Sequence, residues 1–310
     1  MSNVPSTLNL KHWLVAGACA FGLPALAASA QAREAAVPNA MYVEAVQMPA
    51  WAESKSWRRA IAPGSLVLAN ETVETGVGAG LVLSLPEGSV IRLGEKTRLG
   101  VNALQVSNEN GMSQIESKLK LFQGFFRFAT SAVSRVVGQR KLELQLASST
   151  AGIRGTDFWS MTDAEHDAAC IFEGHIDVDT PNQGTVTLAE PTAFWANFFD
   201  KPAEPAGKAT PQQLQKFLSS TELKPGAGVA TMTGKWRVIS GQFSSLNAAK
   251  AQSDVLQKAG YASSLNAVGN AGKLGYEVSI ARLASPDDAN AVAAKVTLIS
   301  GQQAITRLDR

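Results

Sequence analysis

The chain has 310 residues, of which 45% are hydrophobic and 17% are charged, and this balance excludes a disordered protein. Its 28 lysines and arginines against 26 aspartates and glutamates give a net charge of +2, without the strongly basic character that nucleic-acid binding requires. Three histidines and two widely separated cysteines argue against a zinc site. We therefore expect no metal, no cofactor and no nucleic-acid partner.

The first 32 residues have the features of a cleaved secretory signal. Lys11 precedes an apolar run at 13–27, and Ala-Gln-Ala at 30–32 supplies the small residues of a cleavage site. We expect residues 1–32 to be a signal peptide and the mature, exported chain to start at Arg33. The alternative is an uncleaved inner-membrane anchor, because the stretch between Lys11 and Arg33 carries no charge. No later segment approaches the ~20 apolar residues that span a bilayer.

Residues 33–56 are interpreted as a lead segment, and β character extends from residue 57 to about residue 190. Short runs with apolar residues at every second position predict strands at 65–68, 80–85, 89–93 and 141–146. Turn signals separate these runs, as at Pro86-Glu-Gly88. Many short strands with frequent turns favour an all-β roll or solenoid-like domain over alternating β and α units.

Few side chains in this region are candidates for catalysis. Cys170 lies in an apolar run, and His175 would face the opposite side of the same strand, so we expect a buried thiol rather than a nucleophile. Residues 165–167 (Glu-His-Asp) are expected at a solvated hairpin tip. Arg154 and Asp157 either clamp a ligand or, as we favour, pair across a tight turn. We therefore predict no catalytic residues, and hence no enzyme.

Four motifs follow one another in the β region. They are Leu85-Pro-Glu-Gly-Ser-Val-Ile-Arg-Leu93, Leu121-Phe-Gln-Gly-Phe-Phe-Arg-Phe128, Ala151-Gly-Ile-Arg-Gly-Thr-Asp-Phe158 and Phe172-Glu-Gly-His-Ile-Asp-Val178. With these motifs, residues 57–190 resemble the FecR-like periplasmic domain family. The resemblance implies a periplasmic β domain with a binding or signalling role. Only ten residues precede Lys11, so the sigma-binding segment of the usual members has no counterpart, and we do not expect signalling to a sigma factor.

Residues 191–234 have a different character. The aromatic run at 194–199 is expected to pack onto the β domain. Pro202 and Pro205 are typical of a linker. Thr210, followed by proline and by apolar residues at helical spacing, predicts a short helix to residue 218.

The last 76 residues, 235–310, repeat a pattern of strand, helix and strand. Strands are predicted at 236–243, 261–268, 276–283 and 302–306, and helices at 247–258 and 285–298. The order β-α-β-β-α-β predicts a small α+β domain of the split βαβ type, with both helices on one sheet face and the other face free.

This segment opens with Trp236-Arg-Val-Ile-Ser-Gly-Gln-Phe243 and contains Lys258-Ala-Gly-Tyr261 and Tyr276-Glu-Val278. With these motifs it resembles the SPOR (sporulation-related) domain, a peptidoglycan-binding module of the cell envelope that is associated with cell division. Two departures from the family pattern stand out. Ile239 replaces a glutamine that family members present to the glycan, and Ala281-Arg282 replaces Gly-Pro.

The alternation of side chains along strands predicts which residues line the free sheet face. The candidate glycan-binding residues are Arg237, Ile239, Gln242, Glu277, Ser279 and Arg282, with Gln242 returning to the face after a bulge at Ser240-Gly241. Val238, Val278 and Ile280 are expected to face the helices. We expect the lining residues, including Arg237 and Ser279, to be exposed. The competing interpretation is a solvated sheet in a degenerate adaptor domain.

Together, these patterns predict a non-enzymatic exported envelope protein whose partner is peptidoglycan. Residues 235–310 would bind the glycan strands, while the β domain serves as a binding or scaffold module. Another envelope protein is a further candidate partner of the β domain. The alternative is a periplasmic signalling or regulatory protein of FecR type.

Overall fold

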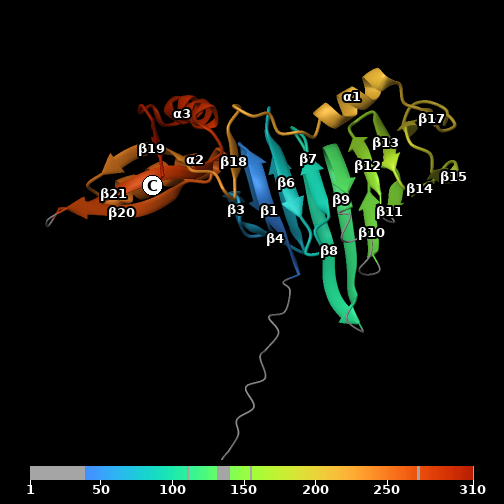
Figure 1. The fold of residues 1–310 in the computed structure, drawn as a ribbon, viewed down its shortest axis with the longest axis horizontal. Helices are drawn as coiled ribbons and strands as arrows, with labels where there is room; N and C mark the ends of the chain where they lie inside the picture. The colour runs from blue at the N-terminus through green and yellow to red at the C-terminus, as the bar shows by residue number, and fades with distance from the viewer. Residues whose placement is uncertain (1–38, 110–111, 131–139, 154–155, 271–272, 310) are drawn as a thin grey trace, which may run out of the picture. The chain divides into compact units, whose positions relative to one another are not determined.

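The computed structural model describes residues 39–109, 112–130, 140–153, 156–270 and 273–309, which belong to one compact unit (Figure 1). These residues form strands for the most part, with three helices among them. Within these ranges, no helix has the length and apolar character needed to cross a membrane. The expected signal peptide and Arg154 lie outside the described residues.

The β region consists of two sheets, here called sheet A and sheet B. Neighbours in sheet A are antiparallel, in the order β4 (Leu66–Leu68), β1 (Ala40–Gln47), β6 (Gly80–Ser84), β7 (Val90–Leu93), β9 (Met112–Ala129), β12 (Asp157–Thr162), β13 (His166–Glu173), β16 (Ala193–Phe198) and β17 (Gly207–Lys208). Sheet B has the order β3 (Arg58–Ala60), β2 (Ala50–Glu53), β5 (Glu71–Thr75), β8 (Arg98–Glu109), β9, β10 (Arg140–Gln145), β11 (Thr150–Ile153), β14 (Ile176–Thr180) and β15 (Gly184–Leu188). Only the β9–β10 pair among these is parallel.

Strand β9 belongs to both sheets because it changes partner at a glycine. Up to Gln123 it pairs with β8 in sheet B, and from Gly124 it pairs with β12 in sheet A. Gly124 has φ +97°, and a Cβ there would lie 2.3 Å from the Thr97 hydroxyl oxygen. A residue with a side chain would therefore be strained and would clash, so glycine allows the strand to cross from one sheet to the other.

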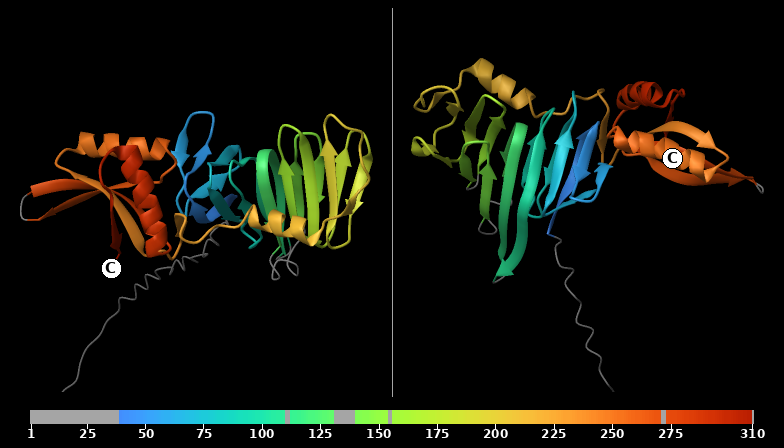
Figure 2. Two further views of the ribbon diagram at one scale, coloured as in Figure 1. Left: turned by 90° about the horizontal axis from the view of Figure 1, so that it is seen from above. Right: turned by 180° about the vertical axis from the view of Figure 1, so that it is seen from behind.

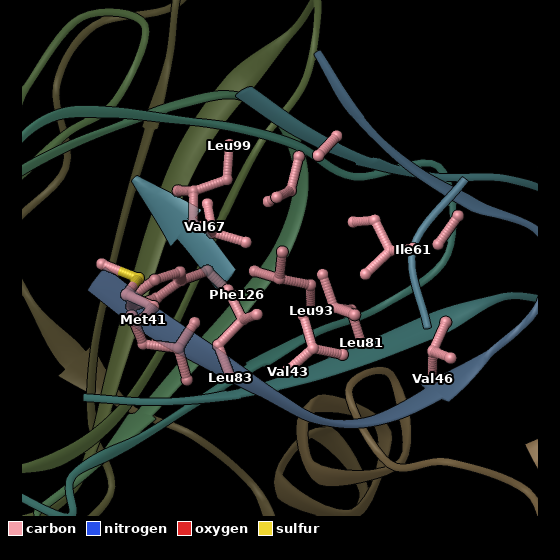
Figure 3. Close-up of a cluster of buried hydrophobic side chains, with 14 of the residues drawn as sticks. Met41, Val43, Val46, Ile61, Val67, Leu81, Leu83, Leu93, Leu99 and Phe126 are labelled. Carbon is pink, nitrogen blue, oxygen red and sulfur yellow. The ribbon is translucent and has the colours of Figure 1, made fainter. Parts of the chain in front are cut away.

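The hydrophobic core of the β region brings together side chains from both sheets (Figure 3). Met41 of β1 and Leu81 of β6 come from sheet A, and Leu99 of β8 comes from sheet B; all three are fully buried. Within the expected lead segment, residues 40–53 belong to this core, since they form β1 and β2. Sequence pattern missed β1 because Ala40 and Met41 are both buried, which breaks the alternation of apolar and polar residues.

Regular structure lies on both sides of the expected linker. The aromatic run forms β16, which pairs with β13 as expected from its apolar character. Helix α1 (Pro211–Ser219) begins at Thr210 with a capping box, as predicted. Its Phe217 ring stacks on Trp159 with centroids 4.0 Å apart, so α1 is held against the β region (Figure 2). Residues 201–208 remain exposed.

The C-terminal part contains β18 (Val229–Thr231), β19 (Trp236–Phe243), α2 (Leu246–Lys258), β20 (Ser264–Asn270), β21 (Lys273–Leu283), α3 (Pro286–Ser300) and β22 (Ile305–Leu308). Four of the strands pair in the order β20-β21-β19-β22. Helix α3 begins at the predicted cap, where the Ser285 hydroxyl accepts a hydrogen bond from the Asp288 amide. Strand β18 pairs with both β1 and β21, so it links this part to sheet A.

One polar cluster of the β region differs from expectation. Glu165 is exposed at the turn between β12 and β13, but Asp167 is fully buried. Its carboxylate accepts hydrogen bonds from the Ser148 amide (2.8 Å), the Ser148 hydroxyl (2.7 Å) and the Ser149 hydroxyl (3.0 Å). The prediction of a solvated tip is wrong for Asp167, because the turn between β10 and β11 supplies partners that local sequence cannot reveal.

Candidate glycan-binding face

The candidate face is the side of the β20-β21-β19-β22 sheet that is turned away from α2 and α3. Ile239 pairs across strands with Ser279 and with Ile305, and Gln242 pairs with Glu277. Directly paired residues project to the same side of a sheet. Ser279 and Glu277 are two positions apart on β21 and so also share a side, which places all five side chains on one face.

The opposite side of this sheet packs against the helices. The expected inward residues Val238, Val278 and Ile280 belong to one buried cluster, and Leu256 of α2 and Val292 of α3 belong to it too. This burial supplies the hydrophobic stabilisation of the domain. It also determines, by alternation, which side chains remain for the other face.

A bulge in β19 returns Gln242 to the candidate face. The register shifts between Ile239 and Gly241, and Ser240 is the extra residue. The Ser240 hydroxyl accepts a 2.6 Å hydrogen bond from the Gln252 amide of α2, so it points to the helices. Gln242 then pairs with Glu277 across strands and returns to the candidate face, as predicted from a bulge at Ser240-Gly241.

Glu277 is the centre of a polar network on this face. Its Oε2 accepts a 3.0 Å hydrogen bond from the Gln242 amide, and its Oε1 lies 3.5 Å from Nη1 of Arg237. The Arg237 guanidinium also pairs with Asp309, just after β22. Only 5% of the Glu277 side chain is exposed, so these partners are needed to offset the loss of water around the carboxylate. Arg237 and Gln242 are thereby held in place.

Three of the expected exposed residues are buried. Ile239 and Glu277 are each 4% exposed, and Ser279 is fully buried. They lie on the two central strands, β19 and β21, each of which is paired along both edges. The Ser279 hydroxyl makes no hydrogen bond with any described residue. The accessible polar groups of the face are those of Gln242, which is exposed, and Arg237, which is half-buried.

Arg282 is not brought to this face. It has φ +65°, and the register of β21 slips next to it, which reverses the alternation of side chains. Its Nη1 donates to the Pro63 carbonyl oxygen at 3.3 Å, so the side chain is directed to the loop before β4. Arg282 is therefore separated from the other five candidates.

Sequence reasoning missed the contribution of the last strand. The predicted strand at 302–306 lies at Ile305–Leu308. Ile305 is 55% exposed beside Ile239, Arg307 pairs with Arg237 across strands, and Asp309 forms the ion pair. The alternation of residues 305, 307 and 309 was the available signal in the sequence. Which sheet face these residues occupy depends on how the strand pairs with β19, and that pairing is set by the tertiary structure.

A groove lies next to Gln242 at the end of the sheet. Its volume is about 690 Å³, and its lining includes Gln242, Phe243, Leu274 and Tyr276. Leu274 is 63% exposed, and the two rings are partly buried. Phe243 and Tyr276 form the next pair along the strands after Gln242 and Glu277, so their rings project to the helix side and the groove lies at the edge of the candidate face.

Comparison with known families agrees with the two parts of the structure. The family model described as FecR protein matches residues 71–177, and the SPOR domain model matches residues 212–307. The chain thus carries a FecR region followed by a C-terminal SPOR domain. The SPOR match begins inside α1, earlier than the expected start at residue 235.

Two crystal structures of a candidate anti-sigma factor from Parabacteroides distasonis are similar to part of the chain. Each is 14% identical, has a TM-score of 0.36 and covers 47% of this chain. The matched parts are 64% and 63% of those chains, so this chain spans less than two thirds of their length. No curated protein matches the sequence.

Proposed function

We propose that this protein is a non-enzymatic component of the cell envelope that binds the glycan strands of peptidoglycan through its SPOR domain. The observation that carries the proposal is the polar network on the sheet face opposite the helices. Glu277 orients Gln242 and Arg237 there without blocking access to either. The split βαβ order of the elements, with a free sheet face, supports the assignment.

The chemistry of the face suits a glycan. The Gln242 amide has both donors and an acceptor for sugar hydroxyls, and the Arg237 guanidinium adds further donors. The exposed Ile305 side chain, which pairs with Ile239 on the same face, offers apolar surface to a pyranose ring. Ile239 has no polar group, so in this chain Gln242 takes over as the main amide of the face. We place the glycan across β19 and β22, between Gln242 and Ile305.

The FecR region acts as a scaffold in this proposal. Hydrogen bonds connect it to the end of α2: the Ala50 amide donates to the Gly260 carbonyl, and the Trp51 indole donates to the Lys258 carbonyl, both at 3.1 Å. The Ala60 amide donates to the Gln257 side chain at 3.1 Å. These contacts leave the candidate glycan face free while holding α2. Another envelope protein binding to the FecR region would be linked to the glycan in this way.

The proposal places the protein in the periplasm after removal of residues 1–32. The basic residue, apolar run and small-residue site at the N-terminus support export. The envelope association of FecR and SPOR domains supports the same compartment.

Sedimentation with purified sacculi tests the glycan proposal. The mature chain, from Arg33, should co-sediment with sacculi, and more strongly after the stem peptides have been removed. Gln242→Ala should weaken retention, because it removes an exposed amide while leaving the core intact. Gln145→Ala, on the exposed side of β10, is the matched control and should leave retention unchanged. No sedimentation of the unmodified chain under either condition would refute the proposal.

The FecR match favours a second candidate function, a periplasmic regulator. Such a regulator would keep its N-terminal segment as a membrane anchor. Mass spectrometry of the envelope fraction distinguishes the two: an N-terminus at Arg33 supports the exported glycan binder. An intact segment from Met1 to Ala32 supports the anchored regulator.

A further inference from the structure

A second cavity lies in the β region and shares no residue with the SPOR match. Its volume is about 320 Å³, and its lining includes Ser148, Asn182, Asn197, Phe198, Phe199 and Lys201. These residues come from the β10–β11 turn, the β14–β15 turn, and β16 with the segment after it. A volume near 300 Å³ is at the lower end of small-molecule sites, so a mono- or disaccharide-sized ligand fits.

The polar wall of the cavity is anchored to a buried charge. Asp167, fully buried, accepts a 2.7 Å hydrogen bond from the Ser148 hydroxyl. The same hydroxyl accepts a 3.0 Å hydrogen bond from Nδ2 of Asn197. This chain of hydrogen bonds fixes the orientation of Asn197 before any ligand arrives, which reduces the entropy lost on binding.

Polar groups on the wall remain available for a ligand. Among the described residues, none hydrogen-bonds to the Asn197 side-chain oxygen or to the Asn182 amide. Each amide has a donor and an acceptor, the combination that binds neighbouring hydroxyls of a sugar. The Phe199 ring, 43% exposed, offers an apolar surface to the face of a pyranose.

Lys201 brings a positive charge to the lining of the cavity. Lys201 Nζ lies 4.3 Å from the centroid of the Phe198 ring, and the lining contains no aspartate or glutamate. Within the described parts of the chain, no carboxylate lies within ion-pair distance of Lys201. A ligand with a carboxylate would supply that partner.

We propose that this cavity binds a saccharide that carries a carboxylate. The two asparagine amides bind the hydroxyls, the Phe199 ring contacts the apolar face of the sugar, and Lys201 binds the carboxylate. The site is independent of the SPOR domain, so its existence does not depend on glycan binding there.

Ligand-detected NMR with the mature chain tests this assignment. The probe is N-acetylmuramic acid, and N-acetylglucosamine is the matched control because it lacks only the lactyl group with its carboxylate. We expect the acid to bind at least about threefold more tightly, the size of a partly exposed ion pair, and the difference to shrink as salt is raised. Equal affinities for the two sugars, or no saturable binding, would overturn the proposal.

Three variants locate the binding. Lys201→Gln should abolish the difference between the two sugars, whereas Lys216→Gln, the same charge change on the exposed side of α1, should not. Asn197→Ala should weaken both sugars; all these measurements use a chain that also carries Gln242→Ala, so that the proposed glycan contact on the SPOR face does not contribute. If Asn197→Ala does not fold, Lys201→Gln still decides the question, because Lys201 is exposed. Unchanged preference for the acid in Lys201→Gln would place the binding elsewhere and refute the proposal.

Discussion

At the scale of single residues, two buried carboxylates illustrate how charges are kept inside this protein. Glu277 has Gln242 and Arg237 as partners, and Asp167 has the serines of the β10–β11 turn. A carboxylate that loses water without such partners would be costly. Both networks also orient side chains at the two proposed binding sites.

Asp167→Asn is expected to destabilise the protein by about 3 kcal/mol, because the new amide places a donor among groups that are themselves donors. Urea unfolding followed by tryptophan fluorescence measures the loss. Asp179→Asn, an exposed residue of β14, is the control and should cost less than about 0.5 kcal/mol. A loss for Asp167→Asn no larger than that of the control would show that the network is not stabilising.

At the scale of elements, α1 shows how a short helix is stabilised by packing. Its capping box satisfies free backbone groups at the N-terminus. Nine residues are too few for a stable isolated helix. Stacking of the Phe217 ring on Trp159 and Phe194 supplies the stabilisation that so short a helix lacks by itself. The same aromatic cluster covers Cys170.

Phe217→Ala should make Cys170 accessible to thiol reagents. Burial raises the pKa of the Cys170 thiol to about 12, so the native protein at pH 8 holds almost no thiolate and should react very slowly. Removing the ring opens the cluster over the thiol and should cost about 3 kcal/mol of stability. The measurement is the rate of labelling with a thiol-specific chromogenic reagent.

Gln215→Ala, on the exposed side of the same helix, is the control and should label as slowly as the unmodified chain. Equal labelling rates for Phe217→Ala and Gln215→Ala would mean that α1 does not protect Cys170.

At the scale of the whole molecule, the exposed segment at 202–206, between β16 and β17, is the expected site of proteolysis, because a segment with few backbone hydrogen bonds is the easiest to cut. Two fragments should result from brief digestion with proteinase K. We expect them to remain associated in gel filtration, since α1 packs on Trp159 and β18 pairs with β1. Fragments that separate without denaturant would show that the two parts fold independently.

The sequence by itself determined the elements whose signals are local. Strands such as β7, and the caps of α1 and α3 at Thr210 and Ser285, depend on side chains only a few residues apart. The motifs of the FecR and SPOR families are also contiguous, and both families match.

Only the tertiary structure decided the burial of Asp167 and Ser279, the role of β1 in the core, and the direction of the Arg282 side chain. Each depends on partners distant in sequence. Asp167 is satisfied by a turn about 20 residues away, and Arg282 is drawn to a carbonyl 219 positions away. Burial and hydrogen bonding are set by neighbours in space, so a pattern that extends over one strand or helix cannot reveal them.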